Sequence, residues 1–449
     1  MGELVTIAVA LLLGGGCAFV VTRSLRPVLR GIVWASFAAH VIAAVFSVFL
    51  VYEVYDGVGD METFVRLSAG YAEYVVAEPG LWLGQFVNML AHRPAEVPFV
   101  PSGGAESSRA MYALATLIQA AFGPSRYGIN LLVAVASFAG KLPLMFALFE
   151  AFHARLHTRI AAATLLLPSL VFWTGGFNKE AVAVCGLGAL FWGTWRVLSK
   201  RSPVRGAIAA ALGALPIAMV KAYILFAFVV AASLWFWFSR PQSRPQVQGL
   251  RAVQLVGRSL VAVAVAGALV VGLAEVFPRF ALNNLVDEMA TLQSYGSLGR
   301  GGSAIQIGPN SGSAFAQAAS TPLALFTALY RPLLFDVRNP LMLVNALEAT
   351  ALLLLTFVVL RRRGFVGSVR AVSGSPVLVF FAAFTLIFAI AVGLSSTNLG
   401  TLSRYRAPMT PFFTCLLLIL ATRPRVPRSM YARRPHTPTP AGRTAWSAA

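Results

Sequence analysis

The sequence predicts an all-α, polytopic membrane protein. Of its 449 residues, 58% are hydrophobic and only 12% are charged, and the mean hydropathy is +0.74. A helix that crosses a membrane needs about 20 apolar residues, and apolar stretches near this length recur along the whole chain. Composition and pattern together exclude an ordinary soluble globular protein.

Roughly eleven stretches are predicted to be transmembrane helices. The region 206–238 is too long for one span and short for two, so Leu215-Pro216 and Lys221 predict a tight hairpin there. The short run 108–123 carries an arginine and a glutamine, and we expect it to lie on or partly in the outer leaflet. The predicted spans are 5–22, 31–52, 127–150, 159–175, 181–198, 206–220, 222–238, 259–277, 341–360, 376–394 and 409–422.

The basic residues predict how these helices are oriented. Six short clusters would share one face, and together they hold 23 of the 36 Lys and Arg residues. Such clusters mark the cytoplasmic side of a membrane protein, so the N-terminus is predicted outside and the C-terminus inside. Glu150 is the only acidic residue expected at the inner face. The six clusters lie at 23–30, 155–159, 196–205, 240–258, 361–370 and 423–443.

This orientation places two long segments, 53–126 and 278–340, on the outer side of a single transmembrane domain that covers residues 1–422. The second segment is rich in glycine and serine, which is typical of a mobile loop that could act as a lid. Residues 423–449 are basic and rich in proline. They are predicted to form a disordered cytoplasmic tail lying against anionic lipid.

The first outer segment begins with an unusual group of acidic residues. Four of the 16 acidic residues fall within positions 53–62, among them Asp56, Asp60 and Glu62. A carboxylate at the mouth of a membrane cavity can act as a general base toward a hydroxyl group, and these three are the candidate catalytic residues. The structural alternative is that Asp60 caps the amphipathic helix predicted to follow it, with Glu62 in the first turn.

Three further motifs supply candidate substrate-binding residues on the same face. Lys179 and Glu180 lie between two spans, where Lys179 could hold an anionic headgroup; alternatively, Asn178 caps the next span and Glu180 lies in its first turn. A guanidinium group can bind two oxygens of a phosphate at once through two N–H groups. Two motifs supply closely spaced arginines. Their candidate residues are Arg331, Asp336, Arg338, Arg404 and Arg406.

The arginines also have a structural alternative. Arg331 and Asp336 could simply pair with each other, while Arg404 and Arg406 could extend to lipid headgroups. Arginines on the outer side run against the positive-inside bias, which favours a functional role.

Other kinds of chemistry find little support. The basic residues are not interleaved with aromatic ones, so no nucleic-acid partner is expected, and the five histidines and three cysteines show no zinc-site spacing. No Walker motif or nucleophile elbow is present. No metal ligand is therefore assigned, the cofactor is unknown, and a divalent metal is compatible with the sequence but not indicated by it.

The acidic motif followed by a membrane-parallel helix resembles polytopic bacterial glycosyltransferases of the GT-C type, the class of protein mannosyltransferases and the aminoarabinose transferase of lipid A. The residues that carry the resemblance are Asp60-Met61-Glu62, Phe64 and the helix to about Tyr74. Pro168-Ser169 with Trp173 and Lys179-Glu180, and the Arg404–Pro408 motif, look like features of related membrane proteins. One span more precedes the acidic loop here than is usual in that family.

The resemblance implies an inverting transfer from a polyprenyl-phosphate-linked sugar to a glycan, lipid or protein acceptor. It would take place at the periplasmic or extracellular face of the bacterial inner membrane. Asp60 would be the base on the acceptor hydroxyl. Lys179, Arg404 and Arg406 would hold the donor phosphate, and Arg331 would neutralise developing charge.

Two other functions fit parts of the sequence. A polymerase or ligase of polyprenyl-pyrophosphate-linked glycans would rely on loop arginines such as Arg279 and Arg300 more than on Asp60. A lipid or solute transporter would place ionisable residues at mid-membrane, where Lys141, Lys221 and Glu348 are the candidates.

Overall fold

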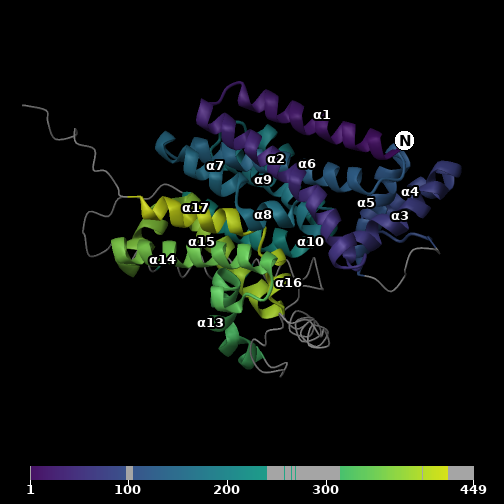
Figure 1. The fold of residues 1–449 in the computed structure, drawn as a ribbon. Helices are drawn as coiled ribbons and strands as arrows, with labels where there is room; N and C mark the ends of the chain where they lie inside the picture. The colour runs from purple at the N-terminus through teal and green to yellow at the C-terminus, as the bar shows by residue number, and fades with distance from the viewer. Residues whose placement is uncertain are drawn as a thin grey trace, which may run out of the picture.

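The computed structural model describes residues 2–97, 105–239, 257, 264, 268, 314–396 and 398–422, and within them every regular element is a helix (Figure 1). Seven helices in these ranges are long and apolar enough to cross a membrane. They are α1 (Gly2–Thr22), α2 (Pro27–Phe49) continued by η1 (Leu50–Val54), α6 (Tyr127–Ala151), α9 (Lys179–Leu198), α10 (Pro203–Ser239), α14 (Pro340–Ser373) and α15 (Pro376–Ser395).

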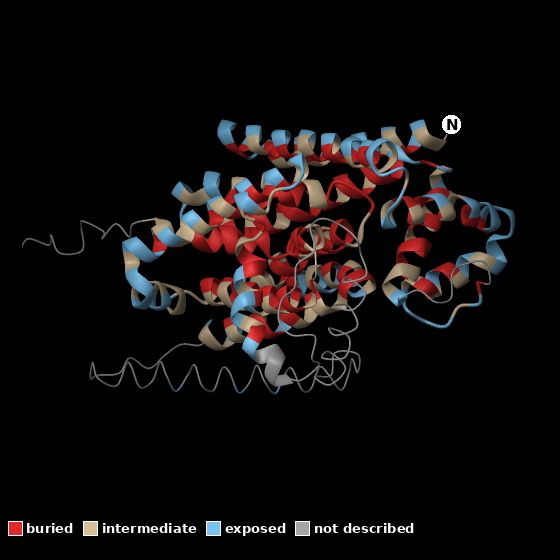
Figure 2. Ribbon diagram, turned by 60° about the horizontal axis from the view of Figure 1, so that its bottom comes forward, coloured by how far each residue is buried: buried red, intermediate tan, exposed pale blue. Residues whose placement is uncertain are grey.

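The outer surface of this bundle is apolar. Only 22% of the most apolar 18-residue stretch of α1 is buried. Leu4, Leu12 and Val20 are between 65% and 75% exposed. Figure 2 shows the exposed side of α1 facing away from the other helices. A continuous apolar surface of this kind is unfavourable in water and well suited to hydrocarbon. The chain is therefore an all-α, multi-pass membrane protein.

The helix α10 reverses direction at Lys221, whose backbone angles (φ −152°, ψ 64°) are not helical. Before this residue, Gly213 packs so closely on Gly186 of α9 that a Cβ atom on Gly186 would collide with the Gly213 carbonyl oxygen. After Lys221, the ring of Trp235 stacks on Phe191, which also belongs to α9, with ring centroids 5.3 Å apart. Both halves of α10 thus run along α9, and the predicted hairpin is confirmed with its turn at Lys221.

The structure differs from the prediction at one predicted span and in one predicted loop. The stretch 159–175 is not one helix but two, α7 (His157–Leu165) and α8 (Pro168–Trp173), because a proline disfavours helical geometry in the residue before it. Part of the predicted loop 278–340 is helical: α13 (Ala314–Tyr330) packs on α15, where Ala324 touches Gly393.

Other predictions concern residues that the structure describes only in part. The segment 259–277, apart from two single positions, the segment 278–313 and the tail 423–449 lie outside the described residues.

Aromatic rings fill the centre of the bundle. Phe380 and Phe384 of α15 contact Phe412 of α17 (Thr410–Ala421), with ring centroids 5.6 and 5.1 Å apart, and Phe191 of α9 joins the same cluster. Edge-to-face contacts of this kind stabilise a core beyond the area that they bury. The cluster holds α9, α15 and α17 together, and α9 carries the candidate residues Lys179 and Glu180 at its start.

A smaller group of helices lies beside one end of the bundle, comprising α3 (Asp60–Ala77), α4 (Pro79–Leu90) and α5 (Glu106–Phe122) (Figure 1). The predicted helix after Asp60 is thus confirmed. Phe64 packs on Tyr112 with ring centroids 5.0 Å apart, and the Gln119 amide donates to the Val65 carbonyl at 2.9 Å. These contacts lock α3 onto α5 and place Asp60 against the end of the bundle.

Candidate functional site

A cavity of about 320 Å³, lined by both apolar and polar residues, opens where η1, α3, α8, α14 and α16 (Leu399–Tyr405) meet. Of the ten candidate residues predicted from the sequence, Asp60 and Arg404 line it. Asn178, Asn345 and Trp173 supply further hydrogen-bonding groups and an aromatic wall. A cavity that combines an aromatic wall with a few polar groups is the usual form of a small-molecule site.

Asp60 does not cap its helix, so the capping part of the structural alternative was wrong, whereas Glu62 does lie in the first turn of α3, as that alternative stated. The N-cap position of α3 is taken by Gly59, whose φ of 150° favours glycine, and no side chain accepts a capping hydrogen bond there. The Asp60 side chain is instead 62% exposed, and its Oδ2 lies 3.4 Å from the Arg404 guanidinium. Its carboxylate is therefore paired with Arg404 but still accessible to a ligand in the cavity.

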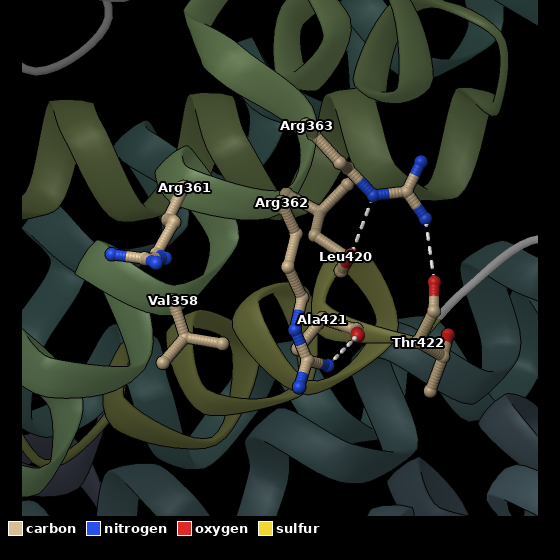
Figure 3. A pocket seen from close by; sticks show the side chains of 7 residues that line it. All are labelled: Val358, Arg361, Arg362, Arg363, Leu420, Ala421 and Thr422. Atoms are coloured by element: carbon tan, nitrogen blue, oxygen red, sulfur yellow. Dashed lines mark hydrogen bonds between the residues drawn. The ribbon is translucent and has the colours of Figure 1, made fainter.

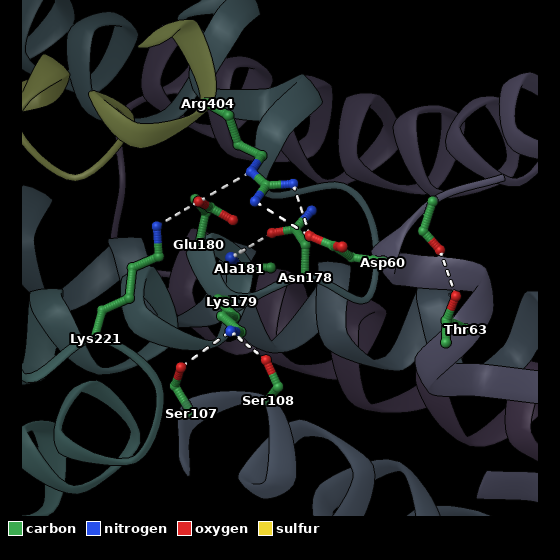
Figure 4. Close-up of polar contacts among 11 residues, drawn as sticks. Asp60, Thr63, Ser107, Ser108, Asn178, Lys179, Glu180, Ala181, Lys221 and Arg404 are labelled. Atoms are coloured by element: carbon green, nitrogen blue, oxygen red, sulfur yellow. Dashed lines mark hydrogen bonds and ion pairs between the residues drawn. The ribbon is translucent and has the colours of Figure 1, made fainter. Parts of the chain in front are cut away.

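Arg404 links two carboxylates that are far apart in the sequence. Its Nη2 lies 3.4 Å from Asp60, and its Nε lies 3.2 Å from Oε1 of Glu180 (Figure 4). Burial opposes the charge on Arg404, but Glu180, Tyr405 and Asp60 raise the pKa of the guanidinium above its ordinary value. Arg404 therefore stays cationic and can hold an anion that enters the cavity.

Glu180 is paired a second time, with Lys221 at the turn of α10. The Lys221 ammonium lies 2.5 Å from Glu180 Oε1, and the two side chains are 5% and 0% exposed. The same ammonium lies 4.1 Å from the centre of the Tyr405 ring. Four side chains of alternating charge thus run from the open cavity into the protein, in the order Asp60, Arg404, Glu180 and Lys221.

The sequence places Lys221 in a predicted hairpin and among the candidates for a transporter pathway, but no local pattern connects this lysine with Glu180. The two residues are 41 positions apart. The predicted hairpin could have indicated this contact. When both arms of a hairpin pack along α9, the turn between them lies at one end of α9, where Glu180 is.

Lys179 points away from this chain of charges. Its ammonium donates to Ser107 and Ser108, at 3.0 and 2.9 Å, near the start of α5 (Figure 4). The preceding Asn178 accepts a hydrogen bond from the Ala181 N–H at 2.9 Å, so the predicted cap of α9 is confirmed. Lys179 therefore joins α9 to the smaller helical group, beside the cavity but not in its lining.

Asp56 and Glu62 are separated from Asp60. Asp56 is exposed in a turn with a left-handed φ of 50°, and it does not line the cavity. The Glu62 side chain is 7% exposed and pairs with Arg66 at 3.4 Å. Burial raises the Glu62 pKa, against the effect of Arg126 and Arg66. The structure thus separates the three acidic candidates and leaves Asp60 in the cavity wall.

The other candidate arginines form a second group. Arg331 binds Asp336 with two hydrogen bonds of 3.0 and 2.5 Å, which confirms the structural pairing given as an alternative. These hydrogen bonds lower the pKa of Asp336, and Arg338 adds to this effect. Arg406 is only 2% exposed and donates to the Arg331 carbonyl at 2.7 Å, so its predicted extension to lipid headgroups was wrong.

The ionisable residues considered for a transport pathway also have partners. The Lys141 ammonium lies 2.7 Å from both His40 Nε2 and Thr174 Oγ1. The Glu348 carboxylate accepts from both the backbone N–H and the hydroxyl of Ser169, at 2.9 and 2.5 Å, where α8 begins. These contacts tie α2, α6, α8 and α14 together. Among the described residues, no group of three or more His, Cys, Asp or Glu is arranged to hold a metal ion.

Comparison of the chain with protein-family models, with curated proteins and with solved structures finds no match. In chemical terms, the cavity offers a carboxylate that can accept a proton, a fixed cation that can hold an anion, and a polar and aromatic wall.

Proposed function

We propose that this protein is a membrane glycosyltransferase that moves a sugar from a polyprenyl-phosphate donor to an acceptor hydroxyl group. The observation that carries the proposal is that the Asp60 carboxylate, which does not cap its helix, lies 3.4 Å from the Arg404 guanidinium in the wall of one cavity. A base and a phosphate-binding cation side by side are what a single-displacement transfer requires. The proposed setting is the outer face of a bacterial inner membrane, with the eleven predicted spans and the GT-C-like architecture.

In the proposed reaction, Asp60 accepts the proton of the acceptor hydroxyl as the hydroxyl oxygen attacks the anomeric carbon of the sugar. The bond from that carbon to the phosphate oxygen breaks, and the configuration at carbon is inverted. The departing polyprenyl phosphate takes up the electron pair, and Arg404 stabilises its additional negative charge. Trp173 gives the sugar ring an aromatic surface to pack against.

Arg404 is the first choice for the donor phosphate because it lines the cavity together with Asp60. Lys179 is held by two serines, and Arg406 is buried against Arg331, so for these residues a direct contact with the phosphate would require rearrangement. We therefore propose that Arg331 and Arg406 stabilise the structure around the site without contacting the donor phosphate.

The experiment compares Asp60→Asn with Asp56→Asn. Both variants remove one acidic charge from the same short segment, but Asp56 does not line the cavity. The purified protein in liposomes is given undecaprenyl-phosphate-linked hexoses and pentoses with an acceptor alcohol, and release of undecaprenyl phosphate is measured. We expect Asp60→Asn to lower the rate by roughly 10²–10⁴-fold, the contribution of a general base, and Asp56→Asn to retain it. An active Asp60→Asn enzyme would contradict the assignment.

A carrier of lipids or solutes is the second candidate, favoured by the buried Glu180–Lys221 pair at the break in α10. Translocation of the same sugar lipids from one leaflet of a sealed liposome to the other, without release of undecaprenyl phosphate, would support a carrier over a transferase. The polymerase or ligase alternative depends on Arg279 and Arg300, which lie outside the described residues. Replacing each of these arginines by Gln in the release assay tests that alternative.

A further inference from the structure

A second cavity, of about 510 Å³, lies between α14 and α17, toward the opposite end of the bundle. It is lined by Arg361, Arg362 and Arg363 of α14 and by the last residues of α17 (Figure 3). Arg361 follows Asn345, which lines the candidate site, by 16 residues along the same helix, or about 24 Å at the rise of an α-helix. The two cavities are therefore separate sites.

Two of the three arginines have a structural task. Arg362 donates to the Ala421 carbonyl at 2.9 Å, and Arg363 donates to the carbonyls of Leu420 and Thr422 at 2.5 and 2.7 Å. They satisfy the free carbonyl groups at the C-terminal end of α17, where positive charge is favourable. Arg361 has no hydrogen bond or ion pair with any described residue, and Figure 3 shows it pointing away from these carbonyls.

None of the described residues that line this cavity is acidic. The carboxylate predicted at this end is Glu150, and it is occupied by Arg196 at 2.7 Å and Arg201 at 3.1 Å. The basic segments 240–258 and 423–449, which the topology predicts on the same side, contain no Asp or Glu. In the part of the chain that the structure describes, no acidic side chain pairs with Arg361, so its guanidinium group is available to an anion that enters the cavity.

An apolar surface adjoins the cavity. The helix α14 is interrupted at Gly364, whose φ of 68° turns the chain, and the residues after it form a short helical end. There Phe365, Val366 and Val369 are 75%, 67% and 48% exposed. Exposed apolar side chains next to clustered arginines match the two parts of an anionic phospholipid, acyl chains and a charged headgroup.

We propose that this cavity binds the phosphodiester headgroup of an anionic phospholipid. Arg361 contacts the phosphate, while Phe365 and Val366 contact the acyl chains. The proposal does not depend on the transferase reaction, because it concerns a different cavity and a different lipid.

The test compares Arg361→Gln with Arg205→Gln and Arg361→Lys by native mass spectrometry of the full-length protein. Arg205 is exposed on α10 and belongs to a basic cluster that the sequence predicts on the same side of the membrane as Arg361. It lies outside the cavity, so its variant controls for the loss of one charge. The probes are phosphatidylglycerol, phosphatidylcholine and inorganic phosphate. One basic residue near an anionic lipid surface contributes enough to change binding by about fivefold.

We expect Arg361→Gln to bind phosphatidylglycerol about fivefold more weakly, while Arg361→Lys and Arg205→Gln bind it like the unmodified protein. Thermal unfolding without lipid should be the same for all variants, because Arg361 makes no hydrogen bond or ion pair with a described residue. An equal loss in Arg205→Gln would overturn the proposal by showing diffuse attraction. Binding of phosphatidylcholine as strong as that of phosphatidylglycerol, or full competition by inorganic phosphate, would overturn it as well.

Discussion

Replacing Glu180 by Gln tests the chain of alternating charges directly. The substitution keeps the shape of the side chain but removes the charge that faces Lys221 at 2.5 Å and Arg404 at 3.2 Å. Lys221 is 5% exposed and would become an unpaired buried cation, while Arg404 keeps Asp60 and partial access to water. Breaking a buried ion pair from one side costs about 3–5 kcal/mol, and we expect Glu180→Gln to lower the free energy of unfolding by this amount.

Glu150→Gln is the matched control. Glu150 also pairs with two cations, but its side chain is 24% exposed and those of Arg196 and Arg201 are 25% and 55% exposed. Pairs open to solvent contribute only about 0.2–1 kcal/mol each. Removing both buried charges in Glu180→Gln/Lys221→Met should restore much of the lost stability, because no unpaired charge is left behind.

The measurement is reversible unfolding of the detergent-solubilised protein, followed by tryptophan fluorescence. Glu180→Gln should be the least stable variant, with the double variant and Glu150→Gln closer to the unmodified protein. If Glu180→Gln were no less stable than Glu150→Gln, the Glu180–Lys221 pair would not be the buried contact that its geometry indicates.

Two further predictions concern stability elsewhere. The hydrogen bonds from Arg331 lower the pKa of Asp336, so this pair stabilises the fold above the ordinary aspartate pKa of about 4, and its contribution is lost as the pH falls through the lowered value. The difference in unfolding temperature between the unmodified protein and Asp336→Asn should therefore shrink below about pH 4; a constant difference would contradict the assignment. Gly188→Ala should destabilise the fold by about 1–3 kcal/mol, because its new Cβ would collide with the Gly140 carbonyl, whereas Gly15→Ala, which has open space, should be neutral in the same unfolding assay.

Local patterns in the sequence predicted much of the fold. Apolar length identified α1, α2 and α6, and the Asn178 cap could be predicted because it depends on a hydrogen bond to a residue only three positions away. The break before α8 could also have been predicted, since Pro168 disfavours a helical conformation at Leu167.

The connections within the candidate site could not be predicted in the same way. The contact between Asp60 and Arg404 joins residues 344 positions apart, and it depends on how α3 and α16 pack rather than on any local pattern. The capping alternative for Asp60 failed because of the backbone at Gly59, which takes the cap position itself. Helix packing and backbone conformation, which periodicity does not encode, thus decided which of the acidic candidates reached the cavity.

The contact between the first helix and α6 has a consequence for how the protein is made. Glu3 accepts hydrogen bonds from the backbone N–H groups of Arg126, Tyr127 and Gly128, at 2.7–2.8 Å, and so caps α6 across 125 positions of sequence. At synthesis rates of about 5–20 residues per second, α1 leaves the ribosome roughly 6–25 s before these partners exist. Until then Glu3 lacks these three partners, so this link between α1 and α6 can form only after the start of α6 has been made.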